Sequence, residues 1–430
     1  MSLELLMPAG SVTKMNLALD YGADAVYLGP PRFSLRAREN HFEDDELKAS
    51  IESVHQRRKK VYMTLNIFSR NRKIKSFTES VKNYAAMKPD AFIMSDPGLA
   101  SIAKETCPEI PIHLSVQANC MNWKSVEFWK KSLGIERVIL SRELFIQEIA
   151  EIKQRVPDIE LEAFVHGSIC IAYSGRCLMS SYMDRRDANQ GVCDNSCRKS
   201  FNVFEKKEFY IEDANLKDGE LYQIDEDENG TYILNAKDLC MINHLEELIK
   251  AGVISFKVEG RTKSEFYAAM VARAYRGALD DCIRGETIQP RWWNDLNKLT
   301  NRGYHTAFMF EDPGANGQSY ESSTKYHETV HLVGFVEQQV ESKTVVENIS
   351  EPLLSKVVLD VKHKISCGQT VQVITPQSSE FTATIKQIVL PNGAVTQDVH
   401  SGIKQVVLQL YSNQVIPKQA MILSDQALIL

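Results

Sequence analysis

The sequence has little of what marks an exported or membrane-anchored protein. Its first 20 residues contain neither a basic leader nor an uninterrupted apolar run, so we expect no signal peptide and no membrane anchor. The expected compartment is therefore the cytoplasm, which keeps thiols reduced. The nine cysteines are for that reason not expected to form a disulfide framework, and clustered ones among them point to metal or redox chemistry.

The chain also has no excess of positive charge. Its formal net charge of -6 gives no global attraction to nucleic acid, so an RNA partner would have to be met by local basic patches. Two runs qualify: Arg57-Arg58-Lys59-Lys60, and Arg70, Arg72 and Lys73 a little farther along. Runs of this kind are also typical of solvated helix ends, and both interpretations stay open.

A third absence concerns the fold. No Gly-x-Gly-x-x-Gly turn follows the first apolar run, where Pro8-Ala9-Gly10-Ser11 stands, and this disfavours an open doubly wound sheet, which remains the alternative. The chain instead contains eight strand-length apolar runs, and seven of the connections carry a helical pattern. Such a series predicts a parallel sheet closed as a (β/α)8 barrel. The expected strands are residues 4–9, 25–29, 61–66, 91–95, 113–116, 137–141, 161–165 and 255–259.

The length of 430 residues predicts more than one domain. Residues 1–310 are expected to form the catalytic barrel, interrupted after its seventh strand by an insertion, residues 166–238, that carries most of the clustered cysteines and a hairpin-like stretch ending at Gly230. Loops after barrel strands build active sites, so the insertion is expected over the active face. Residues 311–326 predict a linker, and the period-two pattern of residues 327–430 predicts a small antiparallel β-barrel domain.

Polar residues at the ends of the expected strands are the expected pocket lining. His166 comes shortly before the first clustered cysteines, where an imidazole can donate to a cluster sulfur or move a proton. Arg261, beside Glu259, suits the binding of a carboxylate or phosphate. We assign expected catalytic roles to these three residues. The expected substrate-binding residues are Asn66, Asp96, Gln117 and Arg142, although Asp96-Pro97-Gly98 is alternatively only a turn.

Five cysteines gather in one region: Cys170, Cys177, Cys193, Cys197 and Cys240. Four thiolates from separate loops can converge on one tetrahedral zinc ion or on one 4Fe-4S cluster, and spacing alone does not choose between them. Close Cys-x-x-Cys pairs, the usual zinc signature, are absent. The other four cysteines lie singly in expected strands or helices, where small buried apolar residues are expected.

The letters of a zinc-peptidase motif occur at residues 327–331, His-Glu-Thr-Val-His. Zinc ligation by this motif needs both histidines on one face of a helix. This copy follows the expected linker and runs into a β-rich stretch, where positions i and i+4 lie much farther apart. We therefore expect no zinc-peptidase site here, and Gly-x-Ser-x-Gly is also absent from a strand-turn-helix setting.

The stretch from Glu162 to Ser180 resembles the signature of the family known as peptidase U32. Other stretches agree in order along the chain, so the resemblance covers the whole barrel: residues 6–10, 25–29, 95–98, 115–117, 234–240 and 257–261. The terminal β segment resembles the C-terminal domain of the longer members. Residues 189–198 are most similar to the tRNA-hydroxylating branch.

This resemblance implies an oxygen-independent hydroxylase with a 4Fe-4S cluster, which forms 5-hydroxyuridine at the tRNA wobble position with prephenate as co-substrate. The implied partners are tRNA and the iron–sulfur assembly machinery. Branches that hydroxylate ribosomal RNA or a ubiquinone precursor, a zinc-dependent peptidase, and a non-catalytic RNA-binding scaffold remain alternatives. The implied cluster ligands are Cys170, Cys177, Cys193 and Cys240, with Cys197 as the alternate.

Overall fold

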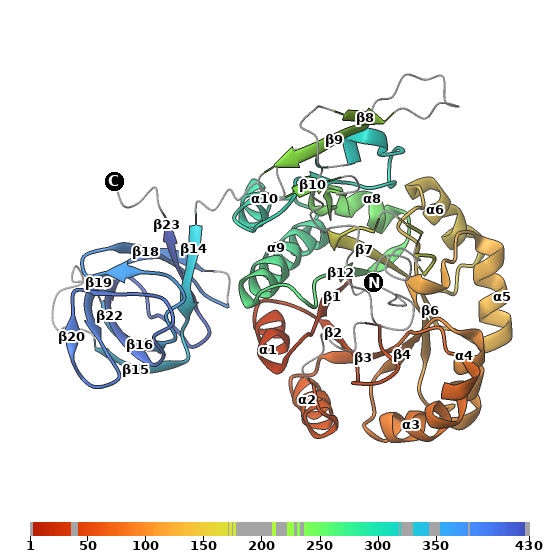
Figure 1. The fold of residues 1–430 in the computed structure, drawn as a ribbon, viewed down its shortest axis with the longest axis horizontal. Coiled ribbons are helices and arrows are strands. Elements are labelled where there is room, and N and C mark those ends of the chain that lie inside the picture. The colour runs from red at the N-terminus through yellow and green to blue at the C-terminus, as the bar shows by residue number, and fades with distance from the viewer. Residues whose placement is uncertain are drawn as a thin grey trace. The chain divides into compact units, whose positions relative to one another are not determined.

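A computed structural model describes residues 3–35, 42–170, 172–173, 175–177, 209–211, 222–227, 230–232, 236–317, 319, 330–343, 353–376 and 379–425. The chain divides into two compact units (Figure 1). The first contains Met1–Leu19, Ala23–Trp293 and Thr300–Tyr326, and the second contains Asp20–Gly22, Asn294–Leu299 and His327–Leu430. The predicted linker, residues 311–326, belongs to the first unit in this division.

The core of the first unit is a closed barrel of eight parallel strands. Each strand pairs with the next, and the last pairs with both the seventh and the first. The predicted (β/α)8 fold is confirmed, and the open doubly wound alternative is wrong. The strands are β1 (Glu4–Pro8), β2 (Ala25–Leu28), β3 (Lys60–Leu65), β4 (Ala91–Met94), β5 (Ile112–Leu114), β6 (Arg137–Ile139), β7 (Glu160–Ser168) and β12 (Val253–Val258).

Helices surround this barrel (Figure 1). In α2, for example, Leu47, Ile51 and Val54 recur at helical spacing and are buried. The helices are α1 (Val12–Asp20), α2 (Asp44–Gln56), α3 (Ile74–Ala86), α4 (Pro97–Thr106), α5 (Trp123–Leu133), α6 (Ile146–Arg155), α8 (Leu245–Lys250), α9 (Glu265–Arg284) and α10 (Pro290–Asn297). None of the helices in the described part of the chain has the length and apolarity needed to cross a membrane.

The segment between β7 and β12 adds strands of its own. Strands β8 (Phe209–Ile211), β9 (Tyr222–Asp227) and β10 (Gly230–Tyr232) form a small antiparallel sheet, which confirms the predicted hairpin. Strand β11 (Asp238–Cys240) runs antiparallel to the end of β7, and β13 (Tyr304–His305) pairs with β11. Strands β11 and β13 thereby widen the sheet at the carboxyl end of β7. Cys240 is the residue of β11 that pairs with His166 of β7.

The second unit is built on an antiparallel half-barrel, as the period-two pattern predicts. In β19, buried Phe381, Ala383 and Ile385 alternate with exposed residues. The order along the main sheet is β14 (Val330–Phe335), β23 (Met421–Asp425), β18 (Thr370–Ile374), β19 (Glu380–Val389), β22 (Val406–Ser412), β16 (Leu353–Leu359) and β15 (Gln338–Lys343), with β20 (Val395–Thr396) beside β19. Strands β17 (Ile365–Ser366) and β21 (Asp398–Val399) form a separate pair.

Candidate active site

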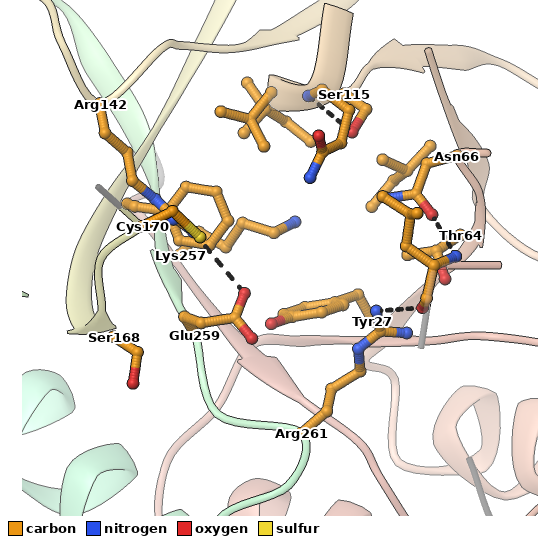
Figure 2. A pocket seen from close by; sticks show the side chains of 16 residues that line it. Tyr27, Thr64, Asn66, Ser115, Arg142, Ser168, Cys170, Lys257, Glu259 and Arg261 are labelled. Carbon is orange, nitrogen blue, oxygen red and sulfur yellow. Dashed lines mark hydrogen bonds and ion pairs between the residues drawn. The ribbon is translucent and has the colours of Figure 1, made fainter. Parts of the chain in front are cut away.

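A cavity of about 90 Å³ lies at the carboxyl ends of the barrel strands (Figure 2). Barrel enzymes build their active sites at this end, because the loops that follow the strands meet there. Five of the polar residues expected from the sequence line the cavity together with Cys170: Asn66, Gln117, Arg142, Glu259 and Arg261. The structure therefore brings together side chains from connections that are far apart in the sequence.

Arg142 and Glu259 form a loose ion pair in the cavity wall (Figure 2). Nη2 of Arg142 lies 3.7 Å from Oε2 of Glu259, which is longer than a hydrogen bond. The guanidinium lies 4.0 Å from the ring centre of Phe164. Both charged side chains keep some exposure, 11% and 17%. A ligand carboxylate can therefore compete with Glu259 for Arg142.

The guanidinium of Arg261 is held by the loop that follows β2. Its Nη1 donates to Ser34 Oγ at 3.2 Å, and its Nη2 donates to the Leu35 carbonyl at 2.6 Å. The Leu35 amide in turn donates to Asn66 Oδ1 at 3.0 Å. Arg261 and Asn66 thus line the cavity and anchor a neighbouring loop at the same time.

Lys257 is a third cation of this cavity, and sequence reasoning missed it. It lies on β12 and is 4% exposed, with Nζ at 2.8 Å from Glu162 Oε1 and 4.1 Å from the ring centre of Tyr27. Burial lowers the pKa of Lys257, and the carboxylate of Glu162 opposes that shift. The alternation of side chains along a strand could have predicted it, because alternation places Lys257 on the same side of the chain as Glu259.

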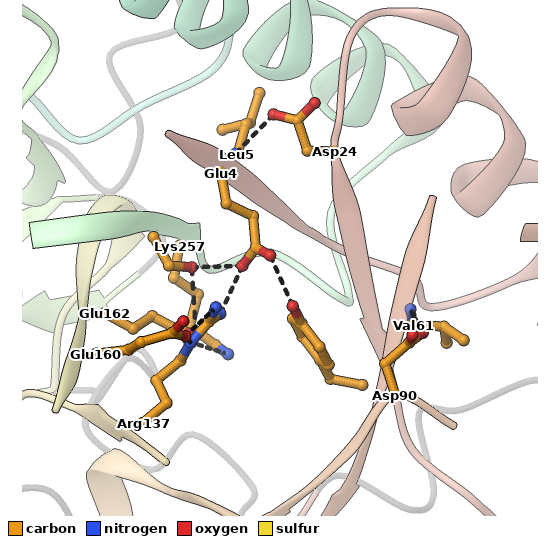
Figure 3. A network of polar contacts seen from close by, with 11 residues as sticks. Glu4, Leu5, Asp24, Val61, Asp90, Arg137, Glu160, Glu162 and Lys257 are labelled. Carbon is orange, nitrogen blue, oxygen red and sulfur yellow. Dashed lines mark hydrogen bonds and ion pairs between the residues drawn. The ribbon is translucent and has the colours of Figure 1, made fainter. Parts of the chain in front are cut away.

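Lys257 connects the cavity to a buried ionic network inside the barrel (Figure 3). Arg137 lies at the centre of this network, 2.5 Å from Glu4, 2.8 Å from Glu160 and 3.0 Å from Glu162. Burial alone would raise the pKa of Glu162, but the charges of Lys257 and Arg137 hold it below its usual value. The two cations therefore favour the ionised form of Glu162 in the interior of the barrel.

His166 lies on β7, is fully buried and is not among the residues that line this cavity. The rings of Tyr267, Tyr275 and Tyr304 lie around it, with centres 5.4 to 5.7 Å away. Burial lowers the pKa of His166 to about 3, which keeps the imidazole neutral near pH 7. The hydroxyl of Tyr275 lies 3.3 Å from His166 Nδ1 and 3.7 Å from the sulfur of Cys240. A catalytic role for His166 remains a prediction.

Asp96 is likewise not among the lining residues of the cavity. It is the N-cap of α4, where Oδ1 accepts from the amides of Gly98 at 2.8 Å and Leu99 at 3.1 Å. Its Oδ2 accepts from the amide of Ser69 at 2.9 Å. Both carboxylate oxygens are thus directed at the backbone, as the turn interpretation of this stretch expected. A substrate-binding role for Asp96 remains a prediction.

Three of the five clustered cysteines lie in the described part of the chain. Cys170 lines the cavity and is exposed, Cys177 is half-buried, and Cys240 is buried. Cys193 and Cys197 lie outside the described residues. Within the described ranges, no three His, Cys, Asp or Glu side chains are grouped as a metal site. Burial raises the pKa of the Cys240 thiol to about 11.

The loop of Cys170 and Cys177 passes close to the connection that follows β5. A Cβ atom on Gly175 would lie 2.2 Å from the carbonyl oxygen of Gln117, and the φ angle of Gly175 is +73°. Only glycine combines this backbone conformation with so close an approach. The thiol-bearing loop is therefore packed against the wall that carries Gln117.

The model of peptidase family U32 matches residues 10–319 of the chain. The chain belongs to peptidase family U32. A relative named "tRNA hydroxylation protein P" from Escherichia coli (strain K12) is 42% identical over 407 residues, 87% of each chain. The protein of the same name from Haemophilus influenzae is 41% identical over 410 residues, 87% of this chain and 86% of that one. A relative from Porphyromonas gingivalis named "Collagenase" is 30% identical over 315 residues, 70% of this chain and 72% of its own.

One histidine of the zinc-peptidase letters can be placed in the structure. His331 lies on strand β14 of the second unit, and its ring stacks on that of His363 with centres 4.0 Å apart. His327 and Glu328 lie outside the described residues. The strand at His331 agrees with the expected β-rich stretch and not with the helix that the motif requires.

Proposed function

We propose that this chain is a tRNA hydroxylase that forms 5-hydroxyuridine at the wobble position without molecular oxygen, using a 4Fe-4S cluster and prephenate. The observation that carries the proposal is the 42% identity to a "tRNA hydroxylation protein P" over 87% of both chains. The cavity supports it independently, because charged side chains and a cysteine meet there at the catalytic end of a barrel.

The charge of the cavity supports a small anionic co-substrate. Its wall holds three cations, Arg142, Lys257 and Arg261, and Glu259 as a carboxylate. Prephenate carries two carboxylates. Arg142 would bind one of them in place of its loose partner Glu259, as a planar guanidinium does with a carboxylate. An ammonium has three donors, and that of Lys257 would bind the other carboxylate while it keeps its bond to Glu162.

The thiols near the end of β7 support a cluster. Cys170 and Cys177 belong to the loop after β7, and Cys240 lies on β11, which pairs with the end of that strand. Cys193 is the proposed fourth ligand and Cys197 the alternate. A bound 4Fe-4S cluster would supply one-electron transfer beside the cavity. The hydroxyl of Tyr275 lies 3.7 Å from the Cys240 sulfur and is held there by its 2.7 Å hydrogen bond to the Val165 carbonyl.

The uridine base would enter the cavity after leaving its stack, as enzymes that act on a nucleobase require. The side-chain amide of Gln117 both donates and accepts, which suits the donor and acceptor groups on the edge of uracil. Cluster loading in the cell by the iron–sulfur assembly machinery is part of the proposal. The anion and the base would then bind next to each other at the carboxyl end of the barrel, beside the thiols.

Two measurements test the proposal. Deletion of the gene is expected to remove 5-hydroxyuridine and its derivatives from tRNA nucleosides analysed by mass spectrometry, and the wild-type chain is expected to restore them. Single serine variants of Cys170, Cys177, Cys193 and Cys240 are expected to lose both rescue and iron after purification without air. Cys107→Ser is the matched control, because Cys107 is buried on its own beside α4 and is expected to retain both.

Each alternative has its own outcome in these measurements. Unchanged tRNA nucleosides after deletion reject tRNA as the substrate, and a hydroxyl lost from ribosomal RNA or from a quinone precursor assigns a different branch. A zinc-containing, iron-free protein overturns the cluster. If Cys193→Ser keeps its iron while Cys197→Ser loses it, the fourth ligand is the alternate one.

A further inference from the structure

The two basic runs of the sequence lie at opposite ends of the barrel. Residues 57–60 lead into β3, and three of them, Arg58, Lys59 and Lys60, line a second cavity of about 560 Å³ at the amino ends of the strands. The second run follows β3. It begins four residues after Asn66, which lines the active-site cavity at the carboxyl ends. The two runs look alike in the sequence, but in the fold only the second run lies at the end of the barrel that holds the active-site cavity.

We define the basic rim as Arg70, Arg72, Lys73 and Lys75. These are four cations within six residues, and no carboxylate interrupts them. Arg70, Arg72 and Lys75 are exposed and Lys73 is half-buried. The rim includes the 3-10 turn Asn71–Lys73 and the start of α3, where a helix N-terminus adds partial positive charge. The rim therefore concentrates four cations in one short segment of a protein of negative net charge.

The loop that carries the rim is anchored beside the cavity. Asp96 Oδ2 accepts from the Ser69 amide at 2.9 Å, directly before the rim. The Ile67 amide donates to the Phe33 carbonyl at 3.4 Å, and the Phe33 ring packs edge-on against Phe77 of α3 at 5.1 Å. A loop fixed in this way loses little entropy when a ligand binds. The carboxylate of Asp96 thus contributes to this anchoring through its hydrogen bond with the Ser69 amide.

The run at the amino end lies among carboxylates and further cations. Lys59 Nζ lies 3.1 Å from Asp24 Oδ1. The cavity that Lys59 lines contains four carboxylates, and Arg137 and Lys153 as further cations; the carboxylates are Glu4, Asp24, Asp158 and Glu160. Carboxylates interspersed among the cations weaken the attraction of this surface for a phosphate.

We propose that the basic rim binds the RNA phosphates next to the nucleotide whose base enters the active-site cavity, and that residues 57–60 take no part. The proposal rests on the proposed function, since it assigns the docking surface of the same RNA. Four residues of chain reach at most about 14 Å, so the rim lies within a few nucleotides of the cavity. Contacts of this kind position the RNA and carry no sequence information.

The test compares two charge-reversal variants of the full chain, Arg70→Glu/Arg72→Glu and, as matched control, Arg57→Glu/Arg58→Glu. Binding of a tRNA transcript with uridine at the wobble position is measured by fluorescence anisotropy over a range of salt concentrations. The rim variant is expected to bind at least ten-fold more weakly at low salt. Its log-log salt slope is expected to fall by about 0.7 to 1 for each phosphate that the variant no longer neutralises. The control variant is expected to keep the wild-type slope.

Equal losses in both variants, or wild-type binding by the rim variant, would overturn the proposal. Arg70→Lys/Arg72→Lys keeps the charge and is expected to retain most of the affinity, which separates charge from folding. Circular dichroism and iron content check that each variant is intact. If the rim variant alone loses tRNA binding while gene deletion leaves tRNA nucleosides unchanged, the proposed hydroxylation fails and the docking surface stands.

Discussion

The two ends of the barrel use the same charged residue types in different ways. At the amino end, Arg137 has three carboxylates within 3.0 Å and is 4% exposed. At the carboxyl end, Arg142 has Glu259 at 3.7 Å and both side chains keep some exposure. Short pairs around a buried cation leave a ligand nothing to bind, whereas a longer, partly exposed pair can exchange its partner. The comparison assigns the amino end to stability and the carboxyl end to binding.

The largest expected effect is that of Arg137→Met at the amino end. Removal of this cation takes a charged partner from the buried carboxylates of Glu4 and Glu162, and we expect the free energy of unfolding to fall by roughly 3–5 kcal/mol. Chemical denaturation measures it. Arg155→Met is the control, since the ion pair of Arg155 with Glu151 is exposed and its loss is expected to cost less than about 1 kcal/mol. Equal costs for the two variants would end the assignment of the amino end to stability.

Arg142→Met tests the carboxyl end. The loss of a charged hydrogen-bond partner is expected to weaken prephenate binding by about 1.5–3 kcal/mol, roughly 10- to 150-fold, in isothermal titration calorimetry. The free energy of unfolding is expected to stay within about 1 kcal/mol, because the pair with Glu259 is long and partly hydrated. Arg142→Lys keeps the charge without the planar fork and should fall between. A variant that loses stability but binds prephenate normally contradicts the comparison.

The pH dependence of stability tests the role of the amino-end network further. The pKa of Glu162 is lowered in the folded state, so its contribution is complete above the ordinary glutamate pKa of about 4.3 and is lost as pH falls below it. In that range the unfolded chain takes up the proton first. The expected slope from this group is at most about 1.4 kcal/mol per pH unit. Denaturation of Glu162→Gln between pH 5 and 3.5 should show a shallower decline than the wild type, and identical slopes would refute this origin.

The smallest expected effect is at Asp96, a structural group at the functional end. Asp96→Ala removes the cap of α4 and the anchor of Ser69, and we expect it to cost about 1 kcal/mol of stability. Weaker tRNA binding is expected to accompany this cost, because the rim loop is released. Asp96→Asn keeps an acceptor oxygen and should retain most of both. Wild-type tRNA affinity in Asp96→Ala would show that the anchor does not matter for docking.

The strands of the barrel could be predicted because each is a short apolar run bounded by turn residues. The run expected at residues 91–95 is observed as Ala91–Met94, and the one at residues 255–259 as Val253–Val258. The five polar residues that line the cavity could also be predicted, because a residue at the end of a parallel strand reaches the same face as its neighbours. The local sequence pattern was sufficient to predict both the strands and these lining residues.

Side-chain direction and distant pairing could not be predicted. Asn66 and Asp96 both follow barrel strands, but Asp96 turns back to cap α4, and nothing in its neighbourhood distinguishes it from a pocket residue except the following Pro97. Lys257 interrupts an apolar run, and its partner Glu162 lies 95 residues away in the sequence. A buried lysine is stable in its charged form only beside a counterion, and folding brings the two residues together.

Arg261 gives the cavity a property that a preformed anion site lacks. Its two terminal nitrogens already donate to Ser34 and to the Leu35 carbonyl. Each of these nitrogens carries a second N–H, so an incoming anion would share the guanidinium with the loop. Ligand binding and loop anchoring therefore depend on one side chain, and anion binding is expected to change the rate of amide hydrogen exchange in residues 33–35.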